Sequence, residues 1–144
     1  MKIIKFKKNN STSYGKLVND KVYAFSTFPW IDQKLNGEVL NLRDLSLLAP
    51  GDPTKIIGLA VNYEGSSGSQ KNMLEPLIFL KPHSSLIGPS EKIISPFKDI
   101  NIWGECELAI IVSNRLKNAT KKEALEAIFA YSVANDVTAE NIHG

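Results

Sequence analysis

Two glutamates, Glu105 and Glu107, stand one residue apart at the start of the aliphatic run WGECELAIIV, residues 103–112. In an extended strand, side chains two positions apart share a face and lie about 7 Å apart, while Cys106 points to the other face. Carboxylates so placed repel each other, and burying them requires a cation, an arginine or access to water. Either the pair simply faces water at the solvated end of a strand, or it forms part of a site.

A third carboxylate, Asp136, stands at the polar end of the run YSVANDVT, residues 131–138. A strand, helix, strand passage would return it beside Glu105 and Glu107. Three carboxylates suit a hard cation such as Mg²⁺, which takes oxygen ligands at about 2.0 to 2.1 Å and keeps open positions, better than they suit zinc. The spacing therefore favours a divalent-metal site if these strands pair.

The elements that must position these carboxylates can be predicted from capping and periodicity. Thr120 and Glu123 have the spacing of a capping box that starts a helix. One helical face then carries four apolar residues, Ala124, Leu125, Ile128 and Phe129. In residues 131–138, apolar and polar side chains alternate as in a strand. Short aliphatic runs predict further strands at residues 55–61, 76–80, 92–95 and 106–112.

The first third of the chain predicts an antiparallel unit. Residues 2–7 and the run YGKLVNDKVYAF indicate short strands, with a hairpin turn at Asn19–Asp20. Residues 41–50 carry leucines at helical spacing after Asn41, and Pro50 to Pro53 ends this predicted helix. We place a boundary there, which gives a small N-terminal subdomain, residues 1–52, and a second part, residues 53–144.

Composition excludes several classes of function. A chain of 144 residues that is 43% hydrophobic and 22% charged can bury a core, so disorder is not expected. The net charge of +2 is carried by scattered lysines, which offer no continuous basic stripe for nucleic acid. No apolar run has the length of a membrane span or signal peptide, and we expect a soluble, cytoplasmic protein. The single cysteine, Cys106, excludes an internal disulfide and a cysteine-based zinc cluster.

Three segments resemble the fumarylacetoacetate hydrolase family in order and spacing. They are KIIGLAVNY (55–63), EPLIFLKPHSSLIGP (75–89) and the stretch from ECELAIIV through YSVANDVTAEN (105–141). The family's matching segments read approximately F-x-K-P, E-x-E and N-D-x-[ST]-A-R-D. The resemblance covers roughly residues 55–142 and implies an α+β fold, with an incomplete mixed β-roll of this family's type behind a small N-terminal α+β subdomain.

The resemblance also implies the roles of individual residues. Glu105, Glu107 and Asp136 match three carboxylate ligands of a divalent metal, Mg²⁺ with Mn²⁺ or Ca²⁺ as alternatives. Lys81 matches a lysine near the anionic end of the substrate, although a lysine at a strand end could also just reach solvent. Asn62 and Tyr63 match substrate-site residues that open a lid loop, and structural roles would suit them equally.

The implied function is a metal-dependent hydrolase, isomerase or lyase of 2-oxo or 2,4-dioxo acids and dioates, from the catabolism of aromatic compounds or sugars. Its metal would hold the substrate and stabilise the developing enolate. Hydrolytic members carry an acid–base His and Glu in the lid, but this chain has Ser66 and Ser69 at those positions. Glu64 or Glu75 could substitute, and His83 suits a turn or surface role better than catalysis. The missing pair favours tautomerisation, decarboxylation or dehydration over hydrolysis.

Family members continue for roughly another hundred residues, so this sequence corresponds to a fragment, to half of a split protein or to a degenerate copy. The competing interpretation is therefore a non-catalytic metal-binding half that needs a second polypeptide. The expected partners are a small 2-oxo acid or dioate and either a second copy in a homodimer or a second chain that completes the β-roll. An isolated remnant whose carboxylates do not converge is the third alternative.

Overall fold

The structure, a computed structural model, describes residues 1–65, 75–95 and 98–140. The chain divides into two compact units. The first contains residues 1–25 and 35–91, and the second contains residues 26–34 and 92–144. Each unit is described by itself below.

The first unit begins with a five-stranded antiparallel sheet in the order β4-β3-β2-β1-β5. Its strands are β1 (Lys2–Lys8), β2 (Ser11–Val18), β3 (Lys21–Phe25), β4 (Leu35–Asn41) and β5 (Ser46–Leu48). The predicted hairpin is confirmed, because β2 pairs with β3 across Asn19–Asp20. Asn19 and Asn9, which lies in the turn between β1 and β2, both have positive φ, a conformation that asparagine tolerates better than most residues.

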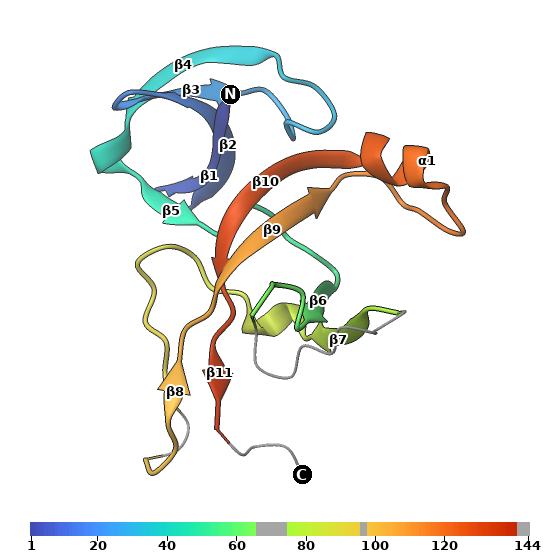
Figure 1. Cartoon of the computed structure of the whole chain (residues 1–144). Helices are drawn as coiled ribbons and strands as arrows, with labels where there is room; N and C mark the ends of the chain where they lie inside the picture. The colour runs from blue at the N-terminus through green and yellow to red at the C-terminus, as the bar shows by residue number, and fades with distance from the viewer. Residues whose placement is uncertain (66–74, 96–97, 141–144) are drawn as a thin grey trace. The chain divides into compact units, whose positions relative to one another are not determined.

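The prediction of a helix over residues 41–50 is wrong. The structure has one 3₁₀ turn there, η1 (Leu42–Asp44), followed by β5. Pairing explains the difference, because Leu47 lies opposite Phe6 in β1 and the leucines reach the core by long-range contact instead of helical spacing. Since this short turn joins the two edge strands β4 and β5, the sheet curls into the ring seen in Figure 1.

The core of this sheet is small and tightly closed. Phe6, Val22 and Ala24 are almost completely buried, and Ile4 of β1 and leucines from β2, β4, η1 and β5 pack around them. Gly15 is needed there, since a Cβ atom at this position would stand 2.5 Å from Cγ1 of Val22.

The same unit also contains a two-stranded ribbon of β6 (Ile56–Ala60) and β7 (Leu77–Lys81), followed by the 3₁₀ turn η2 (His83–Ser85). The strands predicted at residues 55–61 and 76–80 are therefore confirmed. Gly58 lies opposite Phe79, and the phenylalanine ring occupies the space that a Cβ atom at residue 58 would need.

The second unit is built on a long antiparallel ribbon, β9 (Cys106–Val112) and β10 (Ile128–Asn135), joined through the helix α1 (Lys121–Glu126) (Figure 1). The predicted capping box is confirmed, because the Thr120 side chain accepts from the Glu123 amide and the Glu123 side chain accepts from the Thr120 amide. The helix ends earlier than predicted, and Ile128 and Phe129 belong to β10. The passage from β9 to β10 returns the chain antiparallel beside itself, as the carboxylate spacing required.

Beyond the end of this ladder, the chain continues into a second short ladder. In it β8 (Ile102–Trp103) pairs with β11 (Thr138–Ala139). The strand predicted at residues 92–95 is wrong, since these residues form no strand in the structure. In the described part of the chain, no strand pairs with the backbone of these residues.

Residues 26–34, between β3 and β4, also belong to the second unit. Within this segment Phe28 stacks on Trp30 at 5.0 Å between ring centroids. Trp30 meets the ring of Phe129 in β10 edge to face at 6.1 Å, a favourable aromatic geometry. The segment is closed at its base, where the Ser26 amide donates to the Lys34 carbonyl at 2.9 Å.

The fold is α+β and consists mostly of sheet with few helices, as predicted. No helix among the described residues has the length and apolar character needed to cross a membrane.

Candidate functional site

The register of β9 and β10 places the three carboxylate residues on one face of the ribbon. Glu107 lies opposite Ala134, and the Asp136 amide donates to the Glu105 carbonyl oxygen at 2.9 Å. Because directly opposed residues of an antiparallel pair point to the same side, Glu105, Glu107 and Asp136 share a face. They lie where the β9–β10 ladder ends and the β8–β11 ladder begins.

This carboxylate face is the more protected side of the ribbon. Glu105, Glu107 and Asp136 are all half-buried, and Oδ1 of Asp136 is shielded from solvent. Leu108, on the opposite face of β9, is by contrast largely exposed.

The Glu105 side chain has a specific partner that the sequence analysis missed. The indole Nε1 of Trp103 donates to Oε1 of Glu105 at 2.8 Å. The W-x-E spacing was the available signal, because residues two apart in an extended chain share a face. A donor here compensates a carboxylate that is partly removed from water.

The carboxyl groups themselves do not converge on one point. In the part of the chain that the structure describes, no three His, Cys, Asp or Glu side chains lie close enough to hold a metal ion. The ladder thus brings the three backbones together, while Glu105 is directed toward Trp103.

The three predicted substrate residues belong to the first unit and do not lie together there. Lys81 ends β7 and pairs with Ile56 at the start of β6, whereas Asn62 and Tyr63 follow the end of β6. Antiparallel pairing therefore places Lys81 at one end of the ribbon and the other two residues near the opposite end. Lys81 is half-buried, while Asn62 and Tyr63 are exposed.

The backbone immediately before Asn62 is strained. Val61 has a φ of 57°, in the left-handed region that a β-branched side chain rarely adopts. Such outliers concentrate at binding and switch segments, where surrounding structure holds them in place. The strain lies where the predicted lid begins, and no sequence pattern indicated it.

The lid positions Ser66 and Ser69 lie outside the described residues. Glu64 and Glu75, which flank this segment, are both exposed. His83 begins the 3₁₀ turn η2 and is exposed, so its predicted position in a turn at the surface is confirmed.

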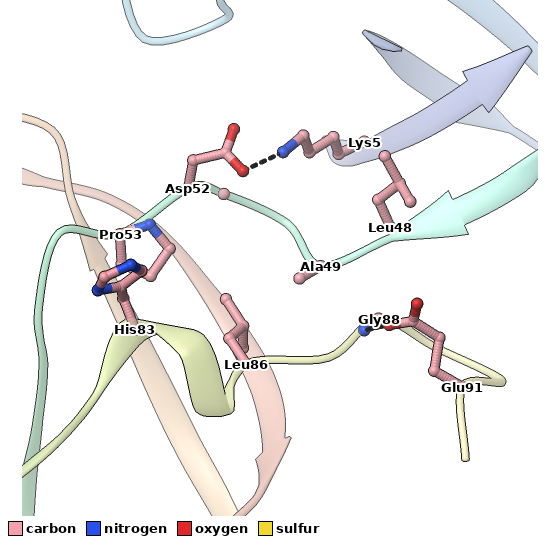
Figure 2. A pocket seen from close by; sticks show the side chains of 10 residues that line it. Lys5, Leu48, Ala49, Asp52, Pro53, His83, Leu86, Gly88 and Glu91 are labelled. Atoms are coloured by element: carbon pink, nitrogen blue, oxygen red, sulfur yellow. Dashed lines mark hydrogen bonds and ion pairs between the residues drawn. The ribbon is translucent and has the colours of Figure 1, made fainter. Parts of the chain in front are cut away.

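A separate hollow of about 310 Å³ opens in the first unit (Figure 2). Its walls include Lys5, Leu48, Asp52, His83, Leu86 and Glu91. Nζ of the buried Lys5 lies 2.5 Å from Oδ1 of Asp52, and Figure 2 shows this ion pair spanning from β1 to the segment after β5.

The chemistry around this hollow does not favour a simple ionic ligand. The Lys5 ammonium also lies 5.8 Å from the ring centroid of Tyr14, and burial together with the charge of Asp52 raises the pKa of Tyr14 to about 12. Because Lys5 is already paired and Glu91 adds negative charge, the hollow is not selective for anions. It contains none of the residues that the sequence analysis selected as ligands.

Comparisons with known proteins identify both parts of the chain. The sequence model described as "Fumarylacetoacetate (FAA) hydrolase C-terminal" matches residues 55–143, and the one described as "Rv2993c-like, N-terminal" matches residues 1–50. A mitochondrial oxaloacetate tautomerase of Xenopus laevis is 36% identical over 109 residues, which are 74% of this chain and 34% of the relative.

Two solved structures illustrate the likeness in fold. A 5-carboxymethyl-2-hydroxymuconate delta-isomerase from Mycobacterium smegmatis superposes with a TM-score of 0.82 at 26% identity, over 96% of this chain and 55% of the other. A maleylpyruvate hydrolase from Sphingobium sp. SYK-6, in complex with manganese(II) ion and pyruvate, gives 0.74 at 22% identity, over 98% and 60%. The chain spans about two fifths of the length of the curated relatives that it matches first.

Proposed function

The chain belongs to the fumarylacetoacetate hydrolase family, and from this premise we propose that it provides the metal-binding part of an enzyme acting on 2-oxo or 2,4-dioxo acids. Its relatives include isomerases, a hydrolase and oxaloacetate tautomerases. The substrates in these relatives' names are 2-oxo acids or dioates, which is also the substrate class that the sequence resemblance implies. We also propose that the protein is a cytoplasmic homodimer that takes part in the catabolism of aromatic compounds.

The observation that carries the proposal is the shared face of Glu105, Glu107 and Asp136. Three carboxylates at one end of a ladder are a donor set that fits a hard divalent cation, and Mg²⁺ is our choice, with Mn²⁺ or Ca²⁺ as substitutes. Family relatives bind a divalent metal, as the manganese in the hydrolase structure illustrates. When bound, the ion would stabilise the negative charge that develops on the 2-oxo oxygen.

The remaining roles belong to side chains of this chain. Trp103 is proposed as a positioning residue, because its indole N–H fixes one oxygen of Glu105 and leaves the other available. Lys81 would pair with a substrate carboxylate, since an ammonium group offers three donors to an anion. Asn62 and Tyr63 would contact the substrate from the segment that follows the strained Val61.

The reaction that fits best is proton transfer next to the 2-oxo group, which is tautomerisation, rather than hydrolysis of a carbon–carbon bond. Hydrolysis requires a positioned base to activate water, and serine stands at both lid positions where hydrolytic members have the acid–base pair. Tautomerisation also needs a proton acceptor, but the C3–H next to a 2-oxo group is already acidic, so solvent water or the exposed Glu64 would accept that proton and return one to the enolate oxygen. Likeness to an oxaloacetate tautomerase supports the same choice. Decarboxylation and dehydration pass through the same kind of charge development and remain the alternatives within this class.

An exchange experiment tests the proposal. The chain is incubated in D₂O with oxaloacetate and millimolar Mg²⁺, and NMR follows deuterium incorporation at C3 above the uncatalysed rate. Glu107→Gln should lower the enzymatic rate by at least about a hundredfold, the order expected when a group needed for charge stabilisation is lost. Glu126→Gln, an exposed glutamate of α1, is the matched control and should retain the rate. Measurable hydrolysis of an acylpyruvate by this chain would overturn the choice of reaction.

The second candidate is a non-catalytic half that binds metal but requires another polypeptide for turnover. The specific observation in its favour is length, because the chain spans only 53% to 60% of the solved structures that it resembles. Metal binding without C3 exchange, followed by exchange when a polypeptide carrying the remaining part is added, would support this candidate over the first.

A further inference from the structure

The β9–β10 ribbon has an apolar face that is open to solvent. It is the face opposite the carboxylates and is formed by alternating residues of both strands, Leu108, Ile110, Val112, Tyr131 and Val133. These side chains are between 51% and 77% exposed, with Val133 the most exposed. Contiguous apolar surface of this kind marks an interaction site rather than ordinary surface.

No charged residue interrupts this apolar face. Cys106 and Asn135, which lie opposite each other, complete it at the carboxylate end of the ladder, and both are exposed. A shallow hollow of about 440 Å³ opens there, lined in part by Gly104, Cys106 and Val133. Charged residues are depleted in the cores of permanent interfaces and common in transient ones, so the composition of this face fits a permanent partner.

The unpaired edges of the β9–β10 ribbon also indicate an interaction site. Among the described residues, β9 and β10 pair with each other and with no third strand. Each strand therefore keeps one row of backbone donors and acceptors that another strand could use. A two-stranded ribbon is marginally stable alone and normally requires a third strand or a covering layer.

The occupant can be inferred from the comparison of lengths. In solved structures that superpose on 94% to 98% of this chain, 40% to 47% of their own sequence has no counterpart here. We propose that the apolar face of β9–β10 binds the polypeptide segment equivalent to that remaining part of the fold. This inference rests on membership of the family and not on the proposed chemistry, since it concerns the face opposite the carboxylates.

Cys106 provides a direct probe of this face. It is the only cysteine of the chain and lies on the apolar face in exposed position. The test compares the rate of its reaction with a thiol reagent in two proteins. One is the chain alone, and the other is the chain fused to the remaining part of the Mycobacterium smegmatis isomerase structure, with any cysteines of that part replaced by serine. Fusion supplies a high effective concentration of the second part.

We expect Cys106 to react readily in the chain alone and at least about tenfold more slowly in the fusion, because buried apolar surroundings suppress thiol reactivity. Val133→Asp should abolish this protection without changing the thermal unfolding of the chain alone, since Val133 is exposed there. Val39→Asp, which changes an exposed valine of β4 in the first unit, should leave the protection intact.

Three results would overturn the inference. Equal reactivity of Cys106 in both proteins would mean that the second part does not cover this face. A marked loss of stability in Val133→Asp alone would mean that the chain already covers the face itself. A dimer of the chain alone that protects Cys106 and dissociates in Val133→Asp would identify a second copy as the occupant. Because the thiol assay contains no metal or substrate, its failure is distinguishable from failure of the proposed activity.

Discussion

Val61 holds the backbone in a conformation that its side chain disfavours. A β-branched residue with a φ of 57° carries a free-energy cost of about 1 to 3 kcal/mol. The residue stands directly before Asn62 and Tyr63, so the local strain and the predicted substrate segment coincide. We interpret the strain as fixing the direction in which the chain leaves β6.

Replacing Val61 with glycine is expected to relieve this strain. Glycine adopts positive φ readily, so Val61→Gly should raise the free energy of unfolding by about 1 kcal/mol, measured by urea denaturation. Val39→Gly, in a strand with ordinary backbone angles, is the control and should lower it by about 1 kcal/mol. Equal destabilisation by the two substitutions would show that Val61 is not strained.

At the residue scale, chemistry was predictable where spacing encodes it. The positions of Glu105 and Glu107 on one strand follow from a period of two, and their face relative to Asp136 follows once the strands pair. The role of Trp103 as a donor and the conformation of Val61 depend on contacts that form only in the folded chain. Neither leaves a signal in local sequence apart from the W-x-E spacing.

At the scale of elements, α1 depends on its cap more than on its length. The helix has six residues, too few for stability by propensity alone, and no residue within it is buried. Its first turn is closed by the reciprocal hydrogen bonds of Thr120 and Glu123. These hydrogen bonds with Thr120 hold the pKa of Glu123 below its usual value.

Thr120→Ala should therefore loosen the helix locally. We expect the Ala124 and Ala127 amides, which donate to the first turn, to exchange about fivefold faster at neutral pH, the factor that corresponds to a typical N-cap loss. Lys121→Ala, beside the cap, should leave their exchange unchanged.

The same comparison predicts a dependence on pH. The pKa of Glu123 is lower in the folded chain than in the unfolded chain. The stability that Glu123 contributes to the helix cap is therefore complete at pH values above its unfolded pKa and is lost as the pH falls through its folded pKa. The difference in amide exchange rate between wild type and Thr120→Ala should therefore become smaller in that acidic pH range. A difference that stays constant with pH would show that the Glu123 carboxylate does not take part in the cap.

Elements were predictable where one local signal dominated. Runs with β-branched residues gave β6, β7 and β9, and the capping box gave the start of α1. Residues 41–50 were misread because β5 is defined by pairing with β1, forty residues away, which a helical spacing of leucines cannot reveal. The extra turn predicted for α1 failed for the same reason, since pairing of Ile128 with Val112 draws it into β10.

At the scale of the whole molecule, the described chain contains more sheet edge and apolar surface than a finished domain. Among the described residues, only the five-stranded sheet of the first unit encloses a core, while β6–β7, β8–β11 and β9–β10 are two-stranded. The chain spans about two fifths of its first curated relatives, and the open ribbons are where additional strands would be accommodated. Sequence periodicity could predict the strands but not which of them lack neighbours.

The measurement that tests the account most directly is titration of the chain with Mn²⁺ followed by electron paramagnetic resonance, which distinguishes free from bound ion. We predict saturable binding of one ion, abolished in Glu107→Gln and in Asp136→Asn, and unchanged in the control Glu126→Gln. Binding of the same strength in wild type, Glu107→Gln and Asp136→Asn would contradict the central claim that the β9–β10 carboxylates form the metal site.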